Sequence, residues 1–253
     1  MTPRPLATLE RALRSAPGVG VLVLLLWLVL VPLFDISART LPALPDVLAN
    51  GGKIWGELID STIYTLTETF LGFLAGSAIG ILSGVLFWRS KRAEQMLLPI
   101  FVALQTVPII AFGAIVVIWF GNGMASKVVI ALYLTFFPVA VNTARGLDQT
   151  NPDLIRLLRS FGASEMRIFR TVSLPTAARS IMTGLKLGIQ LSLVGALVGE
   201  WFGDTTGLGT LLLQSLYFED TERVWLLILL LGVIGQCLFT LLNAIEKKFV
   251  WWS

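Results

Sequence analysis

Long runs of residues without a charge alternate with short charged segments along this chain of 253 residues. A helix that crosses about 30 Å of hydrocarbon needs about 20 apolar residues, and most of the runs reach that length. The run at 180–203 does so if Lys186 snorkels toward one interface and Glu200 lies near the other. The pattern predicts an all-α membrane protein with six transmembrane helices, at about 17–34, 61–88, 93–120, 126–145, 180–203 and 223–245.

The basic residues indicate which side of the membrane each connection occupies. Six spans place both termini on one side, and fifteen of the nineteen lysines and arginines fall on that side. Cytoplasmic segments carry such an excess of Lys and Arg. We therefore expect both termini in the cytoplasm, with a lead-in at 1–16, a membrane domain at 17–245 and a tail at 246–253.

The composition argues against several classes of protein, among them soluble domains, nucleic-acid-binding proteins and enzymes. Only 14% of the residues are charged and the mean hydropathy is +0.81, whereas soluble domains carry about 25% charge. The net charge of +3 reflects membrane sidedness, and no basic patch interleaved with aromatics indicates nucleic acid. With no histidine and one cysteine, Cys237, a metal site and a Ser/His/Asp triad are poorly supported. A Walker-type phosphate loop is also missing, so we do not expect an enzyme.

One charged segment, at about 146–178, combines arginines with apolar residues at helical spacing. Gly162 divides it and permits a tight turn, Ser164 is a candidate N-cap, and Pro175 is expected to stop or redirect the chain. Two short helices at an angle would form a knob that fits a groove on a partner. The alternative is an ordinary amphipathic helix with a solvated basic face. The apolar positions are Leu154, Leu157, Leu158, Phe161, Met166 and Phe169.

Three further features concern the spans. Glycines repeat every fourth residue from Gly72 to Gly84, which lets helices approach closely in lipid. Pro108 predicts broken backbone at 105–108 facing a cavity, because proline frees a carbonyl and bends a helix. The external excursion at 204–221 contains GLGTLLLQSLYF, which predicts a short helix dipping toward the membrane.

The basic segment also carries a recognisable motif. Gly162 is followed by nine residues, then Val172, one residue, and Leu174-Pro175. This resembles the cytoplasmic coupling loop of ABC-importer permeases, whose pattern is E-A-A, three residues, G, nine residues, I-x-L-P. From Leu41 onward the chain is similar to permeases of the nitrate/sulfonate/taurine and pyrimidine-precursor class, notably in TLTETFLGF (65–73), LQTVPIIAFGAIVVIWFGNG (104–123), FFPVAVNTARGL (136–147) and GALVGEWFGDTTGLG (195–209).

The resemblance implies a bacterial inner-membrane permease with the type I importer fold. It implies a second permease copy or paralogue, cytoplasmic ATPase subunits that bind ATP and Mg, an external substrate-binding protein and membrane lipid as partners, with no cofactor in this chain. Arg156-Leu157-Leu158 stands where the family has Glu-Ala-Ala, so we expect an acidic ATPase groove or one member of an asymmetric pair. The implied ATPase contacts are Arg156, Leu157, Leu158, Phe161, Gly162, Ala163, Ser164, Met166, Phe169 and Pro175.

The cargo and its path are inferred from fewer residues. Polar or bent positions within apolar spans predict a path near Gln105, Thr106, Pro108, Asn142 and Glu200, although such residues equally well join helices by hydrogen bonds. The subgroup resemblance favours a flat heteroaromatic cargo, such as a pyrimidine thiamine precursor, ahead of an alkylsulfonate, taurine or nitrate. The alternative class is an ion-gradient carrier or a membrane scaffold. Ionisable relay residues within the spans would favour a carrier, and only three are candidates: Glu68, Lys186 and Glu200.

Overall fold

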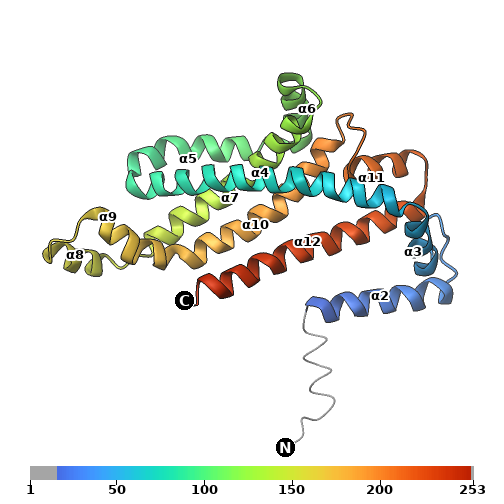
Figure 1. Ribbon diagram of the computed structural model, residues 1–253, viewed down its shortest axis with the longest axis horizontal. Helices are drawn as coiled ribbons and strands as arrows, with labels where there is room; N and C mark the ends of the chain where they lie inside the picture. Colours follow the sequence, from blue (N-terminus) through green and yellow to red (C-terminus); the bar gives the residue numbers. More distant parts are fainter. Residues whose placement is uncertain (1–15, 252–253) are drawn as a thin grey trace, which may run out of the picture. The chain divides into compact units, whose positions relative to one another are not determined.

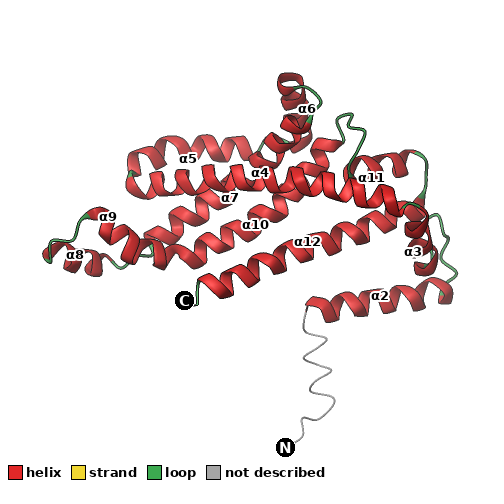
Figure 2. Ribbon diagram, in the orientation of Figure 1, coloured by secondary structure: helices red, strands yellow, loops and turns green. Residues whose placement is uncertain are grey.

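The computed structural model describes residues 16–251, and every regular element in that range is helical (Figure 1, Figure 2). The lead-in at 1–15 and the last two residues of the tail lie outside the described residues. The elements are α2 (Ala16–Leu33), α3 (Leu44–Lys53), α4 (Trp55–Arg89), α5 (Lys91–Gln105), α6 (Ile109–Phe120), α7 (Met124–Asp148), α8 (Pro152–Ser160), α9 (Glu165–Ile168), the π-helical turn η1 (Phe169–Ser173), α10 (Leu174–Glu200), α11 (Leu208–Tyr217) and α12 (Thr221–Phe249).

Four helices of the described chain are long and apolar enough to cross a membrane: α4, α7, the continuous helix Glu165–Glu200, and α12. The pair α5 and α6 would make a fifth span, bent by 99° at its break. Helix α2 is apolar but shorter in its described residues. Membrane helices are thus present, while the number six and the side of each terminus stay predictions.

Contacts divide the described chain into two parts, of which the first comprises residues 16–58 together with 212–230. Two tryptophans organise this part. The Trp27 indole N–H donates to the Pro42 carbonyl at 2.9 Å, and the Trp225 indole N–H donates to the Thr40 carbonyl at 3.1 Å. Their rings meet edge to face with centroids 5.0 Å apart. The segment at 35–60, between the first two predicted spans, contains α3 and the start of α4.

The second part comprises residues 59–211 and 231–253, and α7 lies at its centre. The glycine face of α4 packs on one side of α7, as the four-residue spacing predicted. A Cβ on Gly76 would lie 2.7 Å from the Thr135 Cβ and 2.9 Å from the Leu132 carbonyl oxygen, so no larger residue fits. Successive glycines of α4 meet successive turns of α7, which means that the helices run parallel: Gly72 meets Ala131, Gly76 meets Thr135, Gly80 meets Val139 and Gly84 meets Thr143.

Helix α10 packs on α7 through glycines of its own. Gly184 lies against Asn142, whereas Gly199 lies against Lys127, so the order is reversed and the two helices are antiparallel. Helix α7 is therefore held between two backbones that both approach it without intervening side chains. In lipid, where apolar side chains gain nothing by leaving solvent, such close packing supplies much of the association energy.

The predicted break before Pro108 is present between α5 and α6. Proline lacks an N–H and disfavours helical geometry in the residue before it, so α5 ends at Gln105. The Leu104 carbonyl accepts from the Tyr133 hydroxyl of α7, and the Gln105 amide donates to the Tyr133 carbonyl at 3.5 Å. Helix α7 thus satisfies the backbone that the break exposes, as irregular structure at membrane depth requires.

The glycine contact can be tested with two variants of one helix. Gly76→Ala adds a methyl group that meets Thr135 and Leu132, whereas the same addition at Gly56 meets nothing within 4 Å. Overpacking costs about 1–3 kcal/mol, while Ala favours an open helix position over Gly by about 1 kcal/mol. We expect thermal unfolding in detergent to show a lower midpoint for Gly76→Ala and an equal or higher one for Gly56→Ala. Equal shifts would contradict the contact.

Candidate functional site

A knob of two short helices, α8 and α9, projects from the end of α7. Asn151 caps α8, since its side-chain oxygen accepts from the Asp153 N–H at 2.8 Å, and Pro152 occupies the first turn. The helix ends at a turn in which Gly162 has φ +77°, a conformation that favours glycine. The Ser164 hydroxyl then accepts from the Arg167 N–H at 3.3 Å and caps α9. The predicted turn and cap are both confirmed.

Charged side chains brace the two helices of the knob. The Arg159 guanidinium in α8 donates to both carboxylate oxygens of Glu165 in α9, at 2.7 and 3.0 Å. This hydrogen bonding raises the pKa of Arg159 above its usual value. Arg156 pairs with Asp153 one turn earlier on the same helix and remains 73% exposed. The knob therefore holds its own shape and still presents a guanidinium to its surroundings.

Large apolar side chains of the knob have no cover within the described chain. Phe161 is 79% exposed and Met166 is 58% exposed, and Leu154 and Leu157 are also exposed. Leu154, Leu157 and Phe161 lie outside the four helices that are long enough to be spans, and Met166 lies in the first turn of the continuous helix Glu165–Glu200. Contiguous exposed apolar groups that lipid does not explain mark a surface for another protein.

The base of the knob is anchored to the rest of the second part. Phe169 packs on Trp88 at the end of α4, with ring centroids 5.6 Å apart, and Ile168 is buried. A groove of about 320 Å³ runs between Trp88 and α8, and another of about 420 Å³ lies between Val85, Met166 and Phe169. Phe169 thus contacts its own chain, although the sequence had placed it among the residues that anchor a partner.

The expectation that Pro175 stops the chain is wrong. It lies in the first turn of α10, and the helix runs without interruption from Glu165 to Glu200. The π turn η1 precedes it and inserts one extra residue, so the chain reaches the proline with wider i→i+5 bonding. The knob and α10 therefore form one mechanical element.

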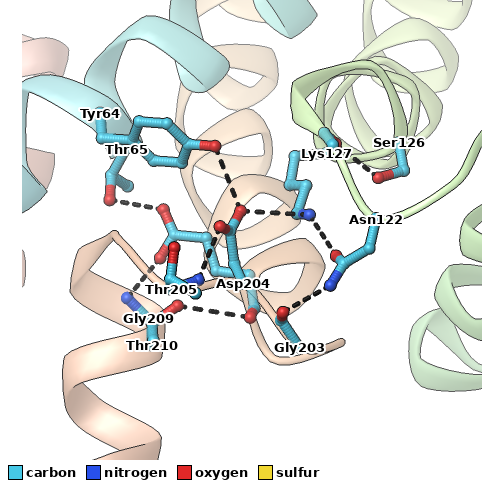
Figure 3. Close-up of polar contacts among 12 residues, drawn as sticks. Tyr64, Thr65, Asn122, Ser126, Lys127, Gly203, Asp204, Thr205, Gly209 and Thr210 are labelled. Atoms are coloured by element: carbon cyan, nitrogen blue, oxygen red, sulfur yellow. Dashed lines mark hydrogen bonds and ion pairs between the residues drawn. The ribbon is translucent and has the colours of Figure 1, made fainter.

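A second cluster of polar residues is buried at the opposite end of α10 (Figure 3). Glu200, the last residue of α10, is 1% exposed. Its carboxylate accepts from the Thr65 hydroxyl of α4 at 2.6 Å and from the Gly209 N–H of α11 at 2.5 Å. Thr65 also accepts from the Leu208 N–H at 2.9 Å. One carboxylate and one hydroxyl thus satisfy the first N–H groups of α11 and tie it to α4.

A buried ion pair continues this cluster toward α7. The Lys127 side chain is completely buried, and its ammonium lies 3.1 Å from the Asp204 carboxylate and 2.6 Å from the Asn122 side-chain oxygen. The Tyr64 hydroxyl donates to Asp204 at 3.3 Å, and Asn122 donates to the Gly203 carbonyl. Helices α4, α7 and the loop after α10 are joined by one network (Figure 3).

Sequence reasoning missed this network. It did not single out Lys127, and it named Glu68 as a candidate relay residue of an ion-gradient carrier. Glu68 lies one turn beyond Thr65 inside α4 and is fully buried. The signal available was the spacing of Thr65 and Glu68, which places two polar groups on one face of an apolar helix.

The residues predicted to line a path do not all meet. Gln105, Thr106 and Pro108 lie together at the break, and the Thr106 hydroxyl donates to the Ala103 carbonyl. Asn142 donates to the Pro138 carbonyl of its own helix and lines a cavity of about 550 Å³ between α5 and α7. Gly199, the residue before Glu200, packs on Lys127, and along α7 this position is about 22 Å from Asn142 at 1.5 Å per residue. The buried hydrogen bonds of Glu200 fit a structural role.

Residues 76–251 match the model of the binding-protein-dependent transport system inner membrane component. The chain belongs to this family. It is a multi-pass inner-membrane permease subunit and not itself an enzyme, since ATP hydrolysis belongs to a separate subunit. The family supports neither alternative raised for the sequence, a gradient-driven carrier or a scaffold.

Individual relatives agree on the permease role and differ in cargo. The chain is 34% identical to the formylaminopyrimidine transport permease ThiX of Halalkalibacterium halodurans, over 90% of this chain and 94% of that protein. It is 28% identical to a putative aliphatic sulfonates transport permease, SsuC of Bacillus subtilis, over 91% and 84%. A solved inward-facing MetNI methionine ABC transporter matches with a TM-score of 0.69 at 19% identity, over 78% of this chain and 97% of that chain. The last likeness shows the fold.

The buried ion pair gives a stability prediction. Lys127→Met leaves the Asp204 carboxylate buried and unpaired, which costs about 3–5 kcal/mol, and adding Asp204→Asn should recover part of the loss. Lys91→Met removes exposed pairs to Glu94 and Asp148 and should cost about 0–1 kcal/mol. Chemical unfolding in detergent measures all three variants. A Lys127→Met loss no larger than that of Lys91→Met would contradict the buried pair.

Proposed function

We propose that the knob α8–α9 couples this permease to a cytoplasmic ATPase of an ATP-driven importer. The observation that carries the proposal is the set of exposed apolar side chains on a self-braced helical knob, with Phe161 and Met166 at its turn. A helix pair of this kind fits a groove on a partner protein. The proposed contacts are Arg156, Leu157, Leu158, Phe161, Gly162, Ala163, Ser164 and Met166.

The connection of the knob to the helices supports a mechanism. The helix from Glu165 to Glu200 is continuous, so displacement of α9 displaces α10. Because Phe169 packs on Trp88 at the end of α4, the same displacement also moves α4. ATP binding that closes the ATPase pair would then favour one arrangement of the helix bundle over another, because a ligand shifts an equilibrium only through its different affinity for the two states.

The charge of the knob bears on the identity of the partner groove. Arg156 stands where the family pattern has glutamate, and it is exposed and paired with Asp153. A guanidinium in a partly desolvated contact requires acidic partners. We expect acidic side chains in the matching ATPase groove, and the second permease of the complex is either a copy of this chain or a paralogue.

The proposed path runs along the break at Gln105–Pro108 and past Asn142. The supporting observations are the bent backbone and the cavity of about 550 Å³ that Asn142 lines. Glu200 is left out because its carboxylate is buried and hydrogen-bonded within the chain. The proposed cargo is a small flat heteroaromatic compound of the pyrimidine type, since ThiX transports a formylaminopyrimidine by its name and is 34% identical.

The docking role predicts loss of ATPase assembly in one class of variants. Phe161→Asp together with Met166→Asp places two charges on the exposed apolar surface without disturbing the buried base of the knob. The ATPase subunit should copurify at least tenfold less, since the two side chains contribute more than about 1.4 kcal/mol to the interface. Phe218→Asp, at a residue that is 76% exposed in another part of the chain, is the control and should assemble normally. Full assembly of the double variant would contradict the docking role.

The cargo is tested on the cognate external binding protein. We expect that protein to retain a pyrimidine and to show no affinity for alkylsulfonates, taurine or nitrate in calorimetric titrations. Tight binding of an alkylsulfonate without pyrimidine binding would overturn the cargo and leave the coupling proposal unchanged.

A further inference from the structure

Helices α10 and α12 form a seam in the second part of the chain. The Gln190 side chain donates to the Gly235 carbonyl at 2.7 Å, and the Lys186 ammonium pairs with Glu246. Lys186 also lies 5.8 Å from the centre of the Phe239 ring. Residue numbers rise along one helix as they fall along the other, so the helices are antiparallel. Spacings of seven and four residues keep Arg179, Lys186 and Gln190 on one face of α10.

A basic groove of about 400 Å³ lies at the end of the seam that the charge bias predicts to be cytoplasmic. Arg179, Glu246, Lys247, Val250 and Trp251 line it. The Glu246 carboxylate is already paired with Lys186, while the side chains of Arg179 and Lys247 form no ion pair within residues 16–251. Trp251 is 79% exposed at the rim. Among the described residues, the groove therefore offers two cations without an ion pair, beside an exposed indole.

An apolar groove of about 550 Å³ continues along the same seam at greater depth. Leu193, Val194 and Leu197 of α10 line it together with Leu231, Gly232, Gly235 and Phe239 of α12, and Gln190 and Gln236 are the polar members. From Arg179 to Gln190 the helix rises about 16 Å, at 1.5 Å per residue. One leaflet of a bilayer has about 15 Å of hydrocarbon, half of the 30 Å core, so an acyl chain covers this distance.

We propose that the seam binds one anionic phospholipid, with its phosphate at Arg179 and Lys247 and an acyl chain in the apolar groove. A guanidinium holds phosphate by charge-assisted hydrogen bonds, and a basic pocket between membrane helices suits an anionic headgroup. The exposed Trp251 indole suits the headgroup level, where tryptophans are enriched. A second copy of this chain is a poorer occupant, because it would bring the same positive charges to the same membrane depth.

The headgroup contact is tested with two double variants. Each removes two positive charges, one from the groove and the other from positions outside it. The purified transporter carries either Arg179→Ala with Lys247→Ala or the matched pair Arg92→Ala with Lys248→Ala, all at exposed positions. Native mass spectrometry then counts retained phosphatidylglycerol and, separately, phosphatidylcholine of the same chain length. We expect phosphatidylglycerol retention to fall about thirtyfold in the first variant only, since each cation near an anionic headgroup contributes about fivefold. The proposal is overturned if phosphatidylglycerol retention falls equally in both double variants or in neither. It is also overturned if the unaltered chain retains phosphatidylcholine as well as it retains phosphatidylglycerol.

The acyl-chain contact is tested separately with Gly232→Leu. A Cβ at Gly232 meets nothing within 4 Å, so leucine fills the apolar groove without a clash inside the chain. Retention of long-chain phosphatidylglycerol should fall at least fivefold, while a six-carbon-chain phosphatidylglycerol, which interacts mainly through its headgroup, should be retained as before. Loss of the permease dimer in Gly232→Leu with unchanged lipid retention would show that a second copy covers the seam, and would overturn the proposal.

Discussion

The packing of α7 between two glycine-bearing helices is the constraint on which the second part of the structure depends. With Gly72–Gly84 on one side and Gly184–Gly199 on the other, the three backbones approach too closely for any added side chain. In lipid this contact supplies attraction that apolar side chains cannot supply by leaving water. It also fixes the register of the three helices, and both candidate sites lie where these helices end.

The two ends of the group formed by α4, α7 and α10 differ in how their polar and apolar side chains are buried. This difference suits a rigid role at one end and a docking role at the other. At one end, buried donors and acceptors around Glu200 and the Lys127–Asp204 pair hold the loop after α10 in one arrangement. Breaking such a network leaves charges without partners in a medium of low dielectric. At the other end, a surface pair between Arg159 and Glu165 braces the two short helices of the knob, and Phe161 is exposed at their turn. The first end resists change, whereas the second presents a surface for a partner that can move it.

Features that depend on neighbouring residues could be predicted from the sequence. The Gly162 turn, the Ser164 cap, the break at Pro108, the glycine face of α4 and the short helix within the external excursion are all present. Features that depend on residues far apart in the sequence could not be predicted. Lys127 and Asp204 are far apart in the sequence, and nothing near either residue indicates that they pair. Phe169 belongs to an amphipathic pattern, but the pattern does not tell whether the apolar face meets its own chain or another. Pro175 was misjudged because a π turn, which has no sequence signature here, carries the helix through it.

The central claim is that the knob contacts the ATPase, and site-directed cross-linking tests it most directly. Cys237 is the single cysteine and is exposed, so it is first replaced by serine. Phe161→Cys in that background is then treated with a short thiol-to-amine cross-linker in membranes that contain the whole transporter. The account predicts an adduct with the ATPase subunit from Phe161→Cys and none from Phe218→Cys. Equal adducts from both positions, or no ATPase adduct from Phe161→Cys, would contradict it.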